Sequence, residues 1–180
     1  MTWRLEDPQC NESAKVRWEL VPYMHGRVLD LGCGPYKTFP HFIGVDNGHH
    51  DKMFGHTGWQ NNADVMVDSC EKLDIFATRS CDMVFSSHLL EHIKYEDVPA
   101  TLTEWCRVIK ADGHLIIYVP DEDEYPKCGD KEGNPDHKWD CNYDKVVAAM
   151  ESVPRGWDLI DYQKRNADKE YSLFFVFKLQ

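Results

Sequence analysis

Short apolar runs recur along this chain of 180 residues, separated by polar segments and by stretches with helical spacing. The clearest run is Val28–Leu31, where apolar residues on both faces are typical of a strand buried inside a parallel sheet. The same pattern predicts further strands at 42–46, 63–67, 81–87, 114–119, 156–162 and 171–179. Because only a short polar turn at 164–170 joins the last two, we expect them to form an antiparallel pair.

Helical spacing predicts three helices, at 14–23, 96–109 and 144–150. Ser13 is placed to cap the first helix, and Gly113 is placed to end the second. About two turns of helix are expected at 36–42, where Pro40 would interrupt them, and another helical segment is expected to begin at His88.

Two long polar segments, 47–62 and 121–142, have no clear periodicity and are predicted to be loops. The second is too long for an ordinary connection, so we expect it to be functional.

The composition predicts one domain with a packed core, since 42% of the residues are hydrophobic. With 20 Lys and Arg against 31 Asp and Glu, the net charge of −11 argues against nucleic acid as a partner. No apolar run is long enough to span a membrane, so no membrane partner is expected. The start of the chain does not resemble a secretory leader, and we expect reduced cysteines in a cytoplasmic protein, either a monomer or a homodimer.

The first predicted strand ends in an acid, Asp30, and runs into a turn that contains Gly32 and Gly34. A second acid, Asp46, ends the next strand. Open α/β sheets bind ligands at this edge, and a carboxylate there can accept the hydrogen bonds of a ribose diol. The fingerprint of nicotinamide dinucleotide binding would need a third glycine at the position of Lys37, so a nicotinamide cofactor is less favoured. A glycine turn that binds no ligand remains an alternative.

These residues resemble a known family. Val28-Leu29-Asp30-Leu31-Gly32-Cys33-Gly34 is similar to the first motif of class I S-adenosylmethionine-dependent methyltransferases. Tyr36 stands where the family usually has a third glycine. The resemblance covers about residues 27–180 and implies a doubly wound, mostly parallel α/β fold of seven strands with an antiparallel C-terminal pair. We therefore expect a single domain over 1–180, with residues 1–24 as an N-terminal helical lid segment.

The resemblance implies S-adenosyl-L-methionine as the cofactor and S-adenosyl-L-homocysteine as its product. Asp46 matches the acid that binds the ribose, and Asp68 matches the acid that contacts the adenine amino group. The full set of residues expected to bind the cofactor is Asp30, Gly32, Cys33, Gly34, Asp46, Asn47, Asp68, Ser69, Ser86 and Ser87.

The string His88-Leu89-Leu90-Glu91-His92 follows the fourth predicted strand. On a helix His88 and His92 would share one face, and either imidazole could act as a base. The sequence also matches the H-x-x-E-H motif of inverted zinc peptidases, but in those enzymes the two histidines lie inside a long helix. Similar strings occur at this point in the resembled family, which favours a place beside the acceptor for His88 and Glu91.

A second candidate base is His137, in the loop before the helix at 144–150. The resembled family often has a histidine here that faces the acceptor. Asp121 or Asp136 could orient it, and these two acids with Trp139 are expected to contact the acceptor. Zinc binding by Cys128, His137 and Cys141, or metal binding by His49, His50, Asp51 and His56, is left as an alternative, because neither spacing is standard; we assign no metal.

The sequence therefore predicts a methyltransferase that uses S-adenosylmethionine and methylates oxygen or nitrogen of a small molecule, for instance a sugar or sugar-linked metabolite. The catalytic candidates are His137, His88 and His92. Two alternatives remain: a module that binds the cofactor without methyl transfer, and an enzyme that cleaves or transfers another part of the cofactor.

Overall fold

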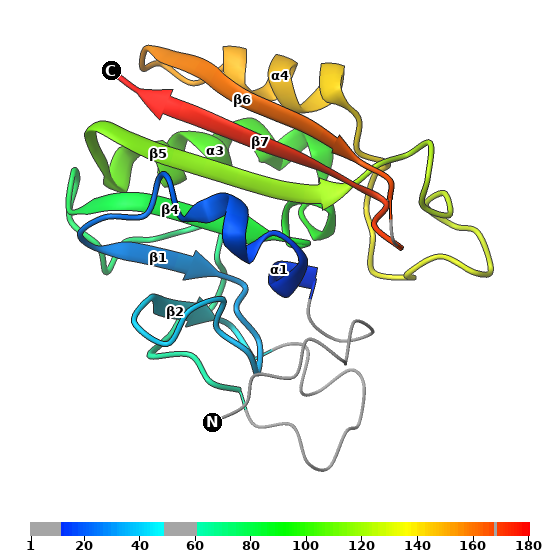
Figure 1. The fold of residues 1–180 in the computed structure, drawn as a ribbon, viewed down its shortest axis with the longest axis horizontal. Helices are drawn as coiled ribbons and strands as arrows, with labels where there is room; N and C mark the ends of the chain where they lie inside the picture. Colours follow the sequence, from blue (N-terminus) through cyan, green and yellow to red (C-terminus); the bar gives the residue numbers. More distant parts are fainter. Residues whose placement is uncertain (1–11, 49–60, 168) are drawn as a thin grey trace.

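The structure, a computed structural model, describes residues 12–48, 61–167 and 169–180. It contains one sheet of seven strands in the order β3-β2-β1-β4-β5-β7-β6 (Figure 1). The strands are β1 Val28–Leu31, β2 Ile43–Asp46, β3 Val65–Met66, β4 Cys81–Ser87, β5 Ile109–Pro120, β6 Trp157–Arg165 and β7 Ser172–Leu179. All seven strands predicted from the sequence are present, although β3 is shorter than expected.

The strands β3, β2, β1, β4 and β5 are parallel, whereas β7 runs antiparallel to both β5 and β6. From β1 the chain moves outward to β2 and β3, and it then returns to place β4 on the other side of β1. This reversal of direction creates a crevice at the carboxyl ends of β1 and β4, the usual ligand position in open α/β sheets. The predicted fold class, a doubly wound and mostly parallel sheet with an antiparallel C-terminal pair, is confirmed.

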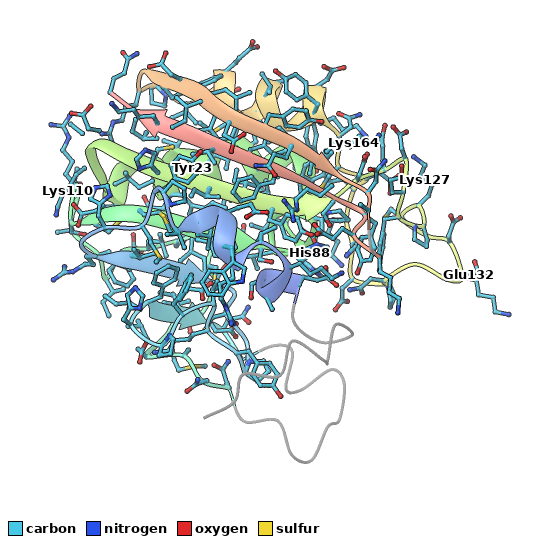
Figure 2. The ribbon with its side chains drawn as sticks, viewed as in Figure 1. Tyr23, His88, Lys110, Lys127, Glu132 and Lys164 are labelled. Carbon is cyan, nitrogen blue, oxygen red and sulfur yellow. The ribbon has the colours of Figure 1, made fainter. Side chains whose placement is uncertain are left out.

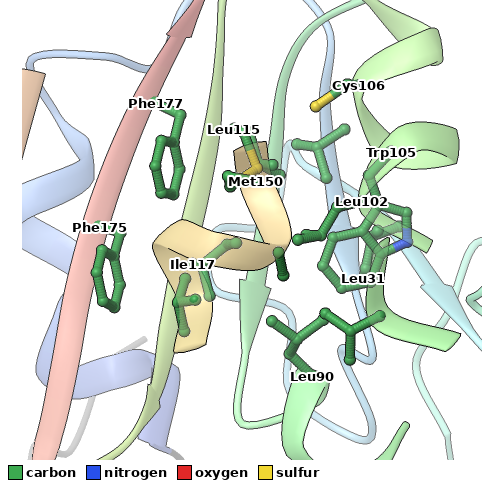
Figure 3. Packing of buried hydrophobic residues seen from close by; sticks show 14 of the residues in the cluster. Leu31, Leu90, Leu102, Trp105, Cys106, Leu115, Ile117, Met150, Phe175 and Phe177 are labelled. Carbon is green, nitrogen blue, oxygen red and sulfur yellow. The ribbon is translucent and has the colours of Figure 1, made fainter. Parts of the chain in front are cut away.

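One face of the sheet is covered by α3 Val98–Val108 and α4 Tyr143–Glu151 (Figure 1). Figure 3 shows Trp105 and Leu102 of α3 and Met150 of α4 packed beside the apolar side chains of the central strands. These side chains are fully buried, as the helical spacing of the sequence predicts. The packed core on this face supports the strands whose carboxyl ends form the crevice.

The other face is covered by short N-terminal elements, α1 Glu12–Lys15 and η1 Arg17–Leu20. The prediction of one helix over 14–23 is wrong in its extent, because the backbone of Val16 leaves the helical region and separates the two pieces. Val16 and Leu20 are nevertheless fully buried against the sheet. The sequence spacing therefore identified the buried positions correctly but not the regular helix.

The expected helix at 36–42 is also absent. The backbone N–H of Thr38 donates to the carboxylate of Asp30 at 2.6 Å, which holds the chain against the end of β1. Phe39 and Phe42 pack into the core on this side of the sheet instead. The connection from β1 to β2 is thus a series of turns, and Pro40, which has no N–H to donate, fits that conformation.

Gly113 does not end α3, contrary to the prediction. The helix ends at Val108, and Gly113 lies inside β5, next to an irregularity in the pairing of β4 with β5. A Cβ at Gly113 would lie 2.6 Å from the carbonyl oxygen of Asp82. The glycine is needed for close approach of two backbones, and it is Asp112 that takes the left-handed conformation, with φ of 60°.

None of the helices in the described ranges is long and apolar enough to cross a membrane. The six cysteines within those ranges are free thiols, and Cys10 lies outside them.

Candidate active site

The bend after β1 contains two glycines in the left-handed region, Gly32 with φ of 68° and Gly34 with φ of 53°. No described atom lies within 4 Å of a Cβ built on Gly34, so the space beside this residue is open. Asp46, at the end of β2, accepts the N–H of Gly34 at 2.9 Å and that of Gly48 at 2.6 Å. Asn61 donates to the same carboxylate at 2.8 Å. Since a carboxylate has about four acceptor positions, Asp46 can accept one more donor from a ligand.

Asp30 is buried at the end of β1, where its carboxylate accepts the N–H of Thr38. Burial raises the pKa of Asp30 to about 6. Asp30 and Asp46 therefore end neighbouring parallel strands on either side of the glycine bend, as the sequence predicted.

Cys33, in the bend itself, is buried, and its burial raises the pKa of the thiol, so it stays protonated. A Cβ on Gly44 would lie 2.7 Å from Cys33 Sγ, so glycine at this position leaves room for the bend to pack on β2. Asn47 and Asp68 are exposed at the ends of β2 and β3, while Ser69 is partly buried and exchanges hydrogen bonds with Glu71.

Two hydroxyls and a strained residue lie at the end of β4. The hydroxyl oxygens of Ser86 and Ser87 are buried and have no hydrogen-bond partner within the described chain. His88 follows them with φ of 49°, an unusual backbone conformation for a residue with a side chain. Figure 2 places His88 at the end of the sheet where Lys127 and Lys164 also lie, and Lys110 at the opposite end. The strand edge therefore offers unpaired polar atoms to a ligand.

A pocket of about 250 Å³ lies at this edge. Its walls include Asn47, Ser69, Cys70, Leu89, His92 and Asp136. Residues predicted to bind the cofactor, Asn47 and Ser69, thus share one pocket with residues predicted to serve catalysis or the acceptor, His92 and Asp136.

Glu91 is the centre of a cluster that the sequence did not predict. Its side chain is completely buried, and burial raises its pKa to about 8. Its Oε1 atom lies 3.4 Å from Nδ1 of His88, 3.7 Å from Nε2 of His137 and 4.0 Å from Nε2 of His92. All three histidines expected to be catalytic therefore face one carboxyl group.

The prediction that His88 and His92 share one face of a helix is wrong. Only Leu90–His92 is helical, as the short helix η2, and His88 precedes it in the left-handed conformation. Nε2 of His88 is 3.0 Å from the hydroxyl oxygen of Ser172, a partner that nothing in the sequence indicated. Burial is the main cause that lowers the pKa of both His88 and His137 below the ordinary histidine value.

The loop that contains His137 is fixed on η2 by two hydrogen bonds. The N–H of Lys138 donates to the carbonyl of Glu91 at 2.8 Å, and the indole N–H of Trp139 donates to the carbonyl of Leu90 at 3.2 Å. Trp139 is buried beneath Tyr95 and anchors the loop. The long polar segment 121–142 therefore has a defined position beside the pocket.

Asp121, one of the two acids predicted to orient His137, forms an ion pair with a lysine. Its carboxylate is 2.9 Å from Nζ of Lys164 on β6. Asp136 lines the pocket next to His137, and its negative charge opposes the fall in the pKa of that histidine. The carboxyl group that faces the His137 imidazole is that of Glu91. The sequence analysis had predicted only that Glu91 contacts the methyl acceptor.

The N-terminal segment also reaches this edge. Oε2 of Glu12 lies 3.7 Å from Nε2 of His88, and the hydroxyl of Tyr171 donates to Oε1 of Glu12 at 2.7 Å. A lid role for residues 1–24 stays a prediction, and residues 1–11 lie outside the described part of the chain, as do His49, His50, Asp51 and His56.

Comparison with protein families gives one match. Residues 29–117 match the model of a methyltransferase domain. This segment runs from β1 to the last part of β5, so it contains Asp30, Asp46 and the whole Glu91 cluster except His137. A search of the curated proteins found no match.

Solved structures share the fold over most of the chain. A protein of Pyrococcus horikoshii is 20% identical with a TM-score of 0.63, and the alignment covers 94% of this chain and 89% of that one. A SAM-dependent methyltransferase of Archaeoglobus fulgidus is 19% identical with a TM-score of 0.63, over 93% and 92% of the two chains. An S-adenosylmethionine-dependent methyltransferase of Mesorhizobium loti is 14% identical with a TM-score of 0.63, over 92% and 97%.

The matched domain and the shared fold agree with the geometry of the strand edge. Open space beside Gly34, an acceptor position on Asp46 and unpaired hydroxyls on Ser86 and Ser87 all fit a ligand with a ribose and an amino-acid end. The methyltransferase-domain match over residues 29–117 and the shared fold around it make this chain similar to S-adenosylmethionine-dependent methyltransferases.

Proposed function

We propose that the protein transfers the methyl group of S-adenosylmethionine to an oxygen or nitrogen of a small-molecule acceptor. The observation that carries this proposal is the shared pocket, whose walls combine Asn47 and Ser69 with His92 and Asp136. A small molecule in the part near His92 would lie next to a cofactor bound at the strand ends. The net charge of −11 favours a small acceptor over a nucleic acid.

The cofactor supplies an activated methyl group, so the chain's main task is to hold the acceptor in line with it. Asp46 would accept hydrogen bonds from the ribose, and the glycine bend would approach the amino-acid end. An acceptor hydroxyl must lose a proton on methylation, and His88, His92 and His137 are the imidazoles placed to receive it or to position the acceptor.

Mass spectrometry of the spent cofactor tests the proposal. The purified protein is incubated with S-adenosylmethionine and a panel of hydroxylated and amino metabolites, sugars included. We expect S-adenosylhomocysteine and a product that is heavier by one methylene. Methylthioadenosine instead would indicate transfer of another part of the cofactor, and calorimetric binding without any product would favour the binding module.

A further inference from the structure

The buried carboxyl of Glu91 lacks the partners that such a group normally has. Its side chain is 0% exposed, and neither oxygen has a hydrogen-bond partner among the residues that the structure describes. Burying a carboxyl group without hydrogen bonds is costly, so native structures usually supply donors or an ion. A bound cation at Glu91 would satisfy these carboxyl oxygens.

The spacing around Glu91 is too wide for direct hydrogen bonds. The nearest imidazole nitrogens lie 3.4, 3.7 and 4.0 Å from Oε1, on His88, His137 and His92 respectively. Direct hydrogen bonds of this kind span about 2.7–3.2 Å. The imidazoles therefore face Glu91 across a gap that they do not close themselves.

The gap is slightly wider than the spacing of ligand atoms around a bound metal ion. One ligand atom each from Glu91, His92 and His137 lies within 4.8 Å of the other two. Ligand atoms about 2.1 Å from a tetrahedral ion lie about 3.4 Å apart, so each pair of ligand atoms would have to move closer by at most about 1.4 Å to complete the site. Two imidazoles and one carboxylate are a donor set typical of zinc and other first-row transition metals, whereas magnesium and calcium prefer oxygen ligands.

The surrounding chain holds these ligands in place. The N–H of Lys138 is bonded to the carbonyl of Glu91, which ties the His137 loop to η2, and the thiol of Cys128 donates to the carbonyl of His137 at 3.0 Å. His88 is fixed through Ser172 and has its other nitrogen toward Glu91. Such outer contacts orient ligands at metal sites.

We infer that Glu91, His92 and His137 bind one divalent first-row transition metal ion such as Zn²⁺, with at least one coordination position open toward the pocket. His92 lies in the wall of that pocket, so the open position would face a bound small molecule. The ion would coordinate an oxygen atom of the methyl acceptor and so favour acceptors that carry oxygen. This statement about the acceptor rests on the proposed function.

Metal titration of the full chain tests the site. The protein is treated with chelator and titrated with Zn²⁺ by calorimetry, and its metal content is measured by mass spectrometry. We expect one ion per chain in the wild type and in the control His25→Ala, whose imidazole is exposed near the start of β1. Glu91→Gln, which keeps the side-chain volume, and His92→Ala should each weaken binding by about 100-fold or more. A wild type that binds no ion, or variants that bind it equally well, would overturn the inference.

Cobalt provides a spectroscopic check of the ligands. Visible absorption of the Co²⁺ protein should show nitrogen and oxygen ligation without the charge-transfer band of a thiolate; a thiolate band would place the ion on cysteines instead. Acetohydroxamate, a small chelator with two oxygens, should shift the spectrum by binding the open position, and no shift would overturn that part.

Cofactor binding separates this inference from the proposed function. S-adenosylmethionine affinity should stay within about twofold of wild type in Glu91→Gln and His92→Ala while the metal is lost. If the wild type binds the metal but shows no methyl transfer to any acceptor, the proposed function fails and the metal site stands.

Discussion

The carboxylate of Asp46 accepts the backbone N–H of Gly34 at 2.9 Å, which ties the end of β2 to the bend after β1. The same side chain also receives the N–H of Gly48, so one residue holds the two loops that border the crevice. Asp46 therefore has a structural role in addition to its predicted role toward the ribose.

Asp46→Ala should weaken S-adenosylmethionine binding by about 100-fold or more. A hydrogen bond from a ribose hydroxyl to a charged acceptor is worth about 1.5–3 kcal/mol, and the glycine bend and the Gly48 loop would also lose the carboxylate that holds them. Isothermal calorimetry measures the affinity, and circular dichroism checks that the variant is folded. Asp158→Ala, an exposed carboxylate on β6, is the matched control and should bind as the wild type does. Unchanged affinity in Asp46→Ala would remove this residue from the cofactor site.

Asp30 should make the stability of the protein depend on pH. Burial raises the pKa of its carboxyl to about 6 in the folded chain, above the unfolded value of about 3.9. Folding thus favours the protonated form, so the stabilising contribution is complete below about pH 4 and is lost as the pH rises through about 6.

Asp30→Asn removes this titration and still offers an oxygen to the N–H of Thr38. The free energy of unfolding of the variant, relative to wild type, should therefore rise by about 1–2 kcal/mol between pH 5 and pH 8. Urea unfolding of the cofactor-free proteins at both pH values measures this difference. A difference that does not change with pH would show that Asp30 is already ionised at pH 5 in the folded protein.

Features set by local physical chemistry could be predicted from the sequence. Val28–Leu31 has apolar residues on both faces and an acid at its end, and these properties alone indicate a buried parallel strand that leads to a ligand edge. Likewise, the helical spacing of Leu102 and Trp105 identified the face of α3 that is buried.

Features set by contacts between distant segments could not be predicted. Glu91 and His137 are 46 positions apart, and their approach depends on the bond from Lys138 to the Glu91 carbonyl, which no local pattern encodes. His88 illustrates the same limit, because the spacing suggested a helix whereas its position is set by Ser172 on β7. Gly113 followed a helix and so resembled a helix stop, but its function is contact with the backbone of Asp82.

Gly113→Ala should destabilise the protein by about 1–3 kcal/mol, since the added Cβ would meet the carbonyl oxygen of Asp82 at 2.6 Å and force β4 and β5 apart. Gly129→Ala is the matched control, because no described atom lies within 4 Å of its Cβ and only its φ of 92° opposes the change. Urea unfolding should show the larger loss for Gly113→Ala. Equal losses would mean that the strands adjust without cost.

His137→Ala should reduce methyl transfer by about 100-fold and leave S-adenosylmethionine affinity within about twofold of wild type. Nε2 of the imidazole lies 3.7 Å from Oε1 of Glu91, among the residues assigned to the acceptor, so we expect its loss to affect the acceptor half alone. With an acceptor from the metabolite panel, S-adenosylhomocysteine formation gives turnover and calorimetry gives cofactor affinity. His25→Ala, at the opposite edge of the sheet, should turn over at the wild-type rate. Wild-type turnover in His137→Ala would exclude this histidine from the reaction, and a parallel loss of cofactor affinity would place it in the cofactor site instead.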